Sequence, residues 1–413
     1  MNPVIIPMQS QTIARPKHIL PIIILSQFAG TAVWFASNAV MADLQAEWHL
    51  MPAALGYMTS AVQLGFIIGT LIFAFFTIAD RFSPRLVFLV CALAAGVANL
   101  SIYLFASGLT SLLVFRFLTG FFLAGIYPVG MKIAAGWYQK GLGNALGFLV
   151  GALVLGTAFP HLLKSLGAAL PWQEVIIAVS FLSAVGGMLM YWLVPDGPFL
   201  KQSARFNGKA LTVIFRSREL RLAAFGYFGH MWELYAFWAF VPVFITGYSA
   251  RFGQPLNTPF WAFAVIAMGA VGCAVGGIIS IRRGSSWVAY TQLAASAMMC
   301  LLSPLLFHLA LIPFLAALLF WGIVVVGDSP QFSALAAQTA PANLVGSALT
   351  IINSIGFAIT IVSIEFLNRL RDSLAIEYLF LLLMAGPALG FLSIRTLRSL
   401  ETVKEKKIPE IPE

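Results

Sequence analysis

Long apolar runs dominate this chain, and they decide what it can fold into. A helix of about 20 apolar residues crosses the hydrocarbon layer of a bilayer, because each residue adds about 1.5 Å to its length. Runs of about this length lie at 18–40, 53–78, 85–105, 111–136, 142–164, 172–194, 221–246, 259–281, 286–307, 311–337, 345–366 and 374–396. The pattern therefore predicts an all-α membrane protein with twelve transmembrane helices.

The composition supports a membrane protein. Hydrophobic residues make up 60% of the chain and charged residues 9%, whereas soluble domains average about 45–50% and about 25%. The net charge of +9 does not indicate a nucleic-acid partner, because the basic residues occupy short gaps between apolar runs and form no continuous face. The expected partners are instead the lipid bilayer and a small-molecule substrate, and we expect a monomer.

The twelve segments fall into two groups of six. We expect a tail at 1–17, an N-terminal half at 18–194, a central loop at 195–220, a C-terminal half at 221–396 and a second tail at 397–413. If both termini face the same side, nineteen of the 24 Lys and Arg residues lie there and four on the other side. The cytoplasmic loops of membrane proteins carry an excess of Lys and Arg. We therefore predict the cytoplasmic (inner) membrane, crossed many times, with both termini cytoplasmic.

The two halves share a local sequence repeat. The stretch 125–135 overlays 327–337, with Gly first, Pro three residues later and Ala-Ala at the end of both. Among the positions where the copies differ, the first has Ile126 and the second has Asp328. Asp328 therefore lies in a segment that its counterpart identifies as a membrane helix, although an early end to the segment would make it a loop residue.

The topology and two motifs resemble the major facilitator superfamily of secondary transporters. After segment 2, Asp80, Arg81 and Arg85 match a family motif whose members form a cytoplasmic gate, and Arg116 with Gly120 is similar to another family motif in segment 4. The run 141–147 has weak similarity to the glycine-rich signature of the nitrate/nitrite branch. The resemblance implies that segments 1, 4, 7 and 10 line a central cavity.

Four ionisable residues lie within these segments. An ionisable group at the centre of a bilayer costs a few kcal/mol, so it needs a partner or a function. His230 and Glu233 are three residues apart and share a helix face. We expect Glu233, Asp328 and His230 to couple transport to protons, since a carboxyl group among apolar side chains is readily protonated and an imidazole can exchange the proton. The alternative is that Glu233 braces a neighbouring helix and His230 satisfies it.

Arg116 has two interpretations that the sequence leaves open. It could attract an anionic substrate or an acid, or it could bridge helices permanently through backbone carbonyls. The further substrate-binding candidates are polar or aromatic residues of the same four segments: Trp34, Asn38, Tyr127, Tyr235, Trp238 and Gln331. The aromatic residues among them would also suit packing.

The sequence contains no phosphate-binding loop, hydrolase motif or paired-cysteine metal motif. We therefore expect no enzyme activity, no cofactor and no metal. The function that remains is secondary active transport of a small metabolite or organic ion by alternating access, coupled to protons. The alternatives are an efflux antiporter for drugs or metabolites and, in another class, a membrane receptor of the same fold that transports nothing.

Overall fold

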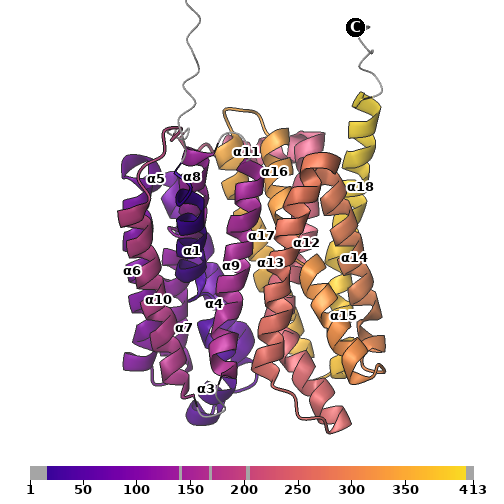
Figure 1. Ribbon diagram of the computed structural model, residues 1–413. Coiled ribbons are helices and arrows are strands. Elements are labelled where there is room, and N and C mark those ends of the chain that lie inside the picture. Colours follow the sequence, from indigo (N-terminus) through magenta and orange to yellow (C-terminus); the bar gives the residue numbers. More distant parts are fainter. Residues whose placement is uncertain (1–15, 139–141, 167–169, 201–204, 406–413) are drawn as a thin grey trace, which may run out of the picture.

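The computed structural model describes residues 16–138, 142–166, 170–200 and 205–405, and all regular secondary structure in them is helical (Figure 1). The N-terminal half contains α1 (Ile19–Thr31), α2 (Ala36–Ala39), α3 (Met41–Trp48), α4 (Ala54–Phe75), α5 (Ile78–Arg81), α6 (Pro84–Phe105), α7 (Leu109–Leu123), α8 (Tyr127–Trp137), α9 (Leu142–Ser165) and α10 (Trp172–Leu193). A short helix, α11 (Lys209–Arg216), precedes the second half.

The C-terminal half contains α12 (Arg218–Phe252), α13 (Thr258–Arg283), α14 (Ser285–Leu306), α15 (Leu311–Val324), α16 (Ser329–Thr339), α17 (Val345–Leu370), the 3₁₀ turns η1 (Ile376–Tyr378) and η2 (Phe380–Met384), and α18 (Ala385–Glu405). The last helix thus continues beyond residue 396, where the sequence predicts its end.

The prediction of an all-α membrane protein is confirmed. Within the described ranges, eleven helical stretches are long and apolar enough to cross a membrane, and α1 is a shorter apolar helix. Expecting one continuous helix over 18–40 was wrong, because α1 ends at Thr31 and α2 begins only at Ala36. The gap between them exposes backbone carbonyls, and a buried arginine reaches two of these, as described below.

The sequence repeat produces the same interrupted helix in both halves. The segment at 109–137 breaks between α7 and α8, and the segment at 311–339 breaks between α15 and α16. The second helix of each pair is 11 residues long and has Pro at its second position, Pro128 in α8 and Pro330 in α16. Proline fits the first turn of a helix because it has no N–H to donate and its φ angle is already helical.

The two halves lie side by side, with the N-terminal half (indigo to magenta) at the left of Figure 1 and the C-terminal half at the right. They meet where α4 packs on α17 and α9 packs on α13. The start of α11 and the end of α18 lie at the top of Figure 1, and α3 lies at the bottom. We call these the terminal end and the far end; the sequence predicts that the terminal end faces the cytoplasm.

Close backbone contacts between helices recur at equivalent glycines. A Cβ atom on Gly120 of α7 would lie 1.9 Å from the carbonyl oxygen of Val62 in α4, and one on Gly322 of α15 would lie 1.9 Å from that of Val265 in α13. No side chain fits at such a distance. Small residues allow this approach, which drives helix association in lipid through dispersion contacts.

We therefore expect Gly120→Ala and Gly322→Ala to destabilise the protein. Each new methyl group must push two helix backbones apart, and overpacking of this kind costs about 1–3 kcal/mol. Thermal unfolding of the purified protein in detergent should show a melting temperature several degrees lower. Gly346→Ala is the control, since a Cβ atom there meets nothing within 4 Å. Equal melting temperatures for Gly322→Ala and this control would contradict the prediction.

Candidate functional site

A small enclosed cavity lies between the two halves. Its volume is about 20 Å³, which is room for about one water molecule. It is lined by Tyr127, Val150 and Leu153 of the N-terminal half and by Tyr227, Met231, Leu234, Tyr235, Trp238, Val326, Ser329, Ser333, Asn353 and Phe357 of the C-terminal half. The lining is therefore aromatic and apolar, with a few uncharged polar groups.

A buried acid and a buried imidazole meet beside this cavity. The Nδ1 atom of His230 lies 2.9 Å from Oδ1 of Asp328, and each side chain is 1% exposed. Asp328 occupies the break between α15 and α16, one residue before Ser329 of the cavity lining. The Nε2 atom of His230 and both carboxylate oxygens of Asp328 make no hydrogen bond, so the 2.9 Å contact is close but is not aligned as a hydrogen bond. Atoms of both side chains that can exchange protons are thus left without a hydrogen-bonded protein partner.

Aromatic rings enclose this pair. The ring centroids of Tyr227 and Phe332 lie 6.0 Å and 5.7 Å from that of His230. Tyr227 also lines the cavity, so its side chain borders both the pair and the cavity. An apolar surrounding of this kind makes any net charge on the pair costly.

Glu233 has different partners from His230. Its carboxylate accepts hydrogen bonds from Ser296 Oγ (2.6 and 2.8 Å), Trp321 Nε1 (2.8 Å) and Cys300 Sγ (3.3 Å). These donors belong to α14 and α15, so Glu233 ties α12 to two neighbouring helices of the same half. No direct contact between Glu233 and His230 supports the expected exchange of a proton between them. The partners of Glu233 instead favour the interpretation that this residue braces neighbouring helices.

Arg116 is fully buried and binds the backbone at the break after α1. Its Nη1 donates to the carbonyl of Val33 at 2.9 Å, and its Nη2 donates to the carbonyl of Trp34. Carbonyls that leave a helix inside a membrane must find donors within the protein. The planar guanidinium supplies two at once, which is the helix-bridging interpretation of this residue.

An aromatic layer joins the halves next to the cavity. We use this name for Trp34, Phe35 and Phe66 of the N-terminal half and Tyr235, Trp238 and Phe357 of the C-terminal half. The ring of Trp34 lies 4.9 Å from Phe66, 5.8 Å from Tyr235 and 5.9 Å from Phe357. Phe35 lies 6.1 Å from Trp238. Tyr235 and Trp238 follow Tyr227 along α12, which begins beside α11 at the terminal end, so these contacts bound the cavity on its far side.

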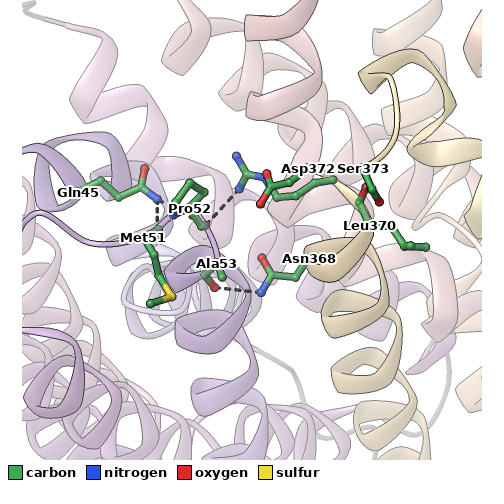
Figure 2. Close-up of polar contacts among 9 residues, drawn as sticks. Gln45, Met51, Pro52, Ala53, Asn368, Leu370, Asp372 and Ser373 are labelled. Carbon is green, nitrogen blue, oxygen red and sulfur yellow. Dashed lines mark hydrogen bonds and ion pairs between the residues drawn. The ribbon is translucent and has the colours of Figure 1, made fainter.

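A polar contact holds the halves together beyond this layer. Asn368 Nδ2 donates to the carbonyl of Ala53 at 3.0 Å, as Figure 2 shows, and Arg371 donates to that of Pro52 at 3.2 Å. One turn away, Ser60 donates to Glu365 at 2.8 Å. We call these three bonds the far-end contact.

The side chain of Asn368 fills a notch in α4. A Cβ atom on Gly56 would lie 2.3 Å from Nδ2 of Asn368, so only a glycine at this position leaves room for the amide. Asn368 is 3% exposed. Polar groups from both halves are therefore buried together at the far end.

A larger cavity of about 170 Å³ lies near the terminal end. Its lining includes Asp80 and Lys132, which form an ion pair, together with Thr70, Ser347 and Thr350. Among the expected gating residues, Asp80 thus pairs with Lys132, while Arg85 lies 3.7 Å from Asp196 and Arg81 is exposed. Two of the three expected gating residues therefore make ion pairs at this end.

The other expected substrate-binding residues divide into two groups. Tyr127, Tyr235 and Trp238 line the cavity. Asn38 instead donates to Thr59 at 2.9 Å, and Gln331 is buried outside the lining. Sequence patterns did not point to five further lining residues, Tyr227, Ser329, Ser333, Asn353 and Phe357. Helical spacing could have found Tyr227, because positions 227, 231, 234, 235 and 238 follow one face of α12.

Comparison with known proteins places these features in a family. The model of the Major Facilitator Superfamily matches residues 23–364. Over 132 residues the chain is 34% identical to the niacin transporter NiaP of Acinetobacter baylyi, covering 30% of this chain and 29% of the relative. Over 228 residues it is 26% identical to the probable sulfoacetate transporter SauU of Cupriavidus necator, covering 49% and 51%.

A third relative bears on the similarity to nitrate/nitrite porters. The nitrate/nitrite transporter NrtP of Nostoc punctiforme is 30% identical over 180 residues, covering 40% of this chain and 34% of the relative. The match to each of these three relatives thus spans about half of its length or less. The glycine-rich run 141–147, on which the similarity was based, lies partly outside the described residues.

Solved structures share the fold over nearly the whole chain. The nucleoside transporter NupG superposes with a TM-score of 0.68 at 12% identity, covering 92% of this chain and 99% of the other. The human organic anion transporter MFSD10 gives 0.67 at 14% identity, covering 92% and 100%. With the family model matching most of its length, the chain belongs to the major facilitator superfamily of secondary transporters.

Proposed function

We propose that this transporter carries a small organic solute together with protons by alternating access, and that Asp328 and His230 form its proton site. The observation that carries the proposal is the buried contact of 2.9 Å between these side chains, beside a cavity that both halves line. Relatives that are named as transporters of niacin, sulfoacetate and D-galactonate support a small organic solute.

The pair can respond to a single proton. With one proton shared between them, the imidazole and the carboxyl group are either both neutral or an imidazolium–carboxylate ion pair. The net charge is zero in both forms. Gain or loss of a proton leaves a net charge in an apolar surrounding, which is costly unless the site opens to water or to a charged solute. Proton binding thereby becomes linked to the conformation of the transporter.

The position of Asp328 lets this charge act on the helix. The residue sits at the break between α15 and α16, so its charge lies next to backbone groups that no continuous helix satisfies. Interrupted helices of this kind are typical of transporter binding sites. A change of charge there would shift α16, which carries Ser329 and Ser333 of the cavity lining.

Alternating access also requires contacts that close one end and can break. The aromatic layer and the far-end contact join the halves on the far side of the cavity. The larger cavity lies toward the terminal end. We therefore interpret this conformation as closed to the far side, with the path to the terminal side only partly closed.

We predict that Asp328→Asn abolishes transport driven by a pH gradient. An amide cannot take up the proton, so a proton gradient can no longer drive transport through this site. In proteoliposomes, uptake driven by an inward proton gradient should fall at least tenfold, while exchange of labelled for unlabelled solute without a gradient persists. His230→Gln should act in the same direction.

Two controls accompany these variants. Glu174→Gln makes the same kind of change at an exposed acid in the first turn of α10 and should leave driven uptake intact. Glu233→Gln tests the other buried carboxyl group. It should lower the melting temperature, because the NH₂ of the new amide would face donors such as Ser296 and Trp321. The response of transport to pH should be retained. Driven uptake that survives Asp328→Asn but is lost with Glu233→Gln would move the proton site to Glu233.

We predict that Asn368→Ala weakens closure of the far end. The change removes the hydrogen bond to Ala53 and empties the notch at Gly56. Thr59→Cys, a fully buried position behind this contact, then reports opening by its reaction with a membrane-impermeant maleimide. The native cysteines in the described residues are all buried, so background labelling should be low.

Labelling at position 59 should become several-fold faster with Asn368→Ala than without it. Gln254→Ala, at an exposed amide of the same end, is the matched control and should leave the rate unchanged. Equal labelling rates in the presence and absence of Asn368→Ala would show that this contact does not hold the far end closed.

A further inference from the structure

We propose that the solute is a planar compound with one aromatic or heteroaromatic ring and a single polar group. This inference rests on the proposed function, since it names the class of solute that the same cavity takes. It follows from which side chains line the cavity, which polar groups there have no partner and which charges the lining lacks.

Flat side chains form most of the contact surface of the cavity. Tyr127, Tyr227, Tyr235, Trp238 and Phe357 all line it. The ring of Tyr235 lies 5.2 Å from that of Trp238 and 5.2 Å from that of Phe357, at interplanar angles of 70° and 49°. Tilted and edge-to-face arrangements at this separation are those that aromatic rings prefer. A flat solute ring could replace these contacts with equivalent ones.

The lining also offers uncharged polar groups to one substituent. The side chain of Trp238 is 0% exposed, and its indole Nε1 has no hydrogen-bond partner. A buried N–H without a partner costs free energy, so a solute acceptor that binds it would be favoured. Ser329 and Ser333 lie one turn apart on α16, next to Asp328, and can donate to a second atom of the same substituent.

The lack of charged side chains in the lining distinguishes this class of solute from other small solutes. Among the residues that line the cavity, all of them described, none is Lys, Arg, Asp or Glu. An inorganic anion would lack the cation that normally compensates its burial. A polyhydroxylated sugar acid would leave several of its hydroxyl groups against aromatic and aliphatic side chains. One ring with one polar group fits both the apolar surface and the few donors.

The size of the cavity is consistent with a solute that enters when the halves separate. Its volume of about 20 Å³ is too small for a ring, yet its walls belong to different halves. Tyr127 of α8 faces a lining formed mostly by α12, α16 and α17 of the other half. Movement of one half away from the other therefore widens the cavity without unfolding either half.

Two probes that differ only in aromaticity test this inference. Benzamide and cyclohexanecarboxamide carry the same uncharged amide on six-membered rings, one flat and one puckered. Binding to the purified protein in detergent is measured by calorimetry and by the rise in melting temperature, since a ligand of the folded state stabilises it. We expect benzamide to bind at least tenfold more tightly. Gluconate and nitrate, representing sugar acids and inorganic anions, should not bind.

Paired variants locate the binding to the cavity. Trp238→Leu should weaken benzamide binding at least tenfold. Trp232→Leu is the matched control, because Trp232 lies on the same helix but outside the lining and packs against Phe366. It should leave the affinity unchanged. Equal loss with both variants would place the binding elsewhere and overturn the inference.

The outcomes separate the solute class from proton coupling. Equal affinities for benzamide and cyclohexanecarboxamide, or binding of gluconate or nitrate alone, would overturn the aromatic class and leave the proton site untouched. A flat ring that binds tightly while its transport ignores the pH gradient would instead overturn the proton coupling and leave the class of solute standing.

Discussion

A helix that breaks inside a membrane must satisfy its free backbone groups within the protein, and this constraint organises the transporter. The break after α1 leaves the carbonyls of Val33 and Trp34 without helical partners, and Arg116 donates to both. The same residues begin the aromatic layer, in which Trp34 contacts Tyr235 and Phe357 of the other half. A single buried cation thereby fixes the aromatic surface that closes the cavity.

The equivalent breaks in the two halves carry different side chains. Gly125 and Gly327 precede helices of equal length that each begin one residue before a proline. At the next position the N-terminal half has Ile126, which is buried among apolar residues, and the C-terminal half has Asp328 beside His230. The repeat thus builds two similar walls, and only the second carries the acid that we propose as part of the proton site.

The sequence predicts the fold well because membrane helices obey simple rules of length and polarity. The all-α membrane class follows from apolar runs alone, and the interruption near Pro330 follows from its missing N–H. The break after Thr31 could not be foreseen, because it depends on Arg116, which lies 83 residues further along than Val33. The boundaries of the expected domains and the side of the membrane that each end faces stay predictions.

The site was only partly predictable for a similar reason. Sequence spacing places His230 and Glu233 on one face of α12, yet the pair that forms joins His230 to Asp328, nearly a hundred residues away. Glu233 turns to Ser296, Cys300 and Trp321, which no local pattern connects to it. Periodicity identifies which residues can share a face, but the packing of α14, α15 and α16 decides which partner each one meets.

The central claim is that solute and protons cross together through the site at Asp328 and His230. The most direct test is an internal pH indicator in proteoliposomes that hold the transporter, with protein-free liposomes as the blank. Addition of a carried solute without an imposed pH gradient should change the internal pH at a rate that matches solute uptake. Uptake of the solute with no change of internal pH beyond the blank would contradict the account.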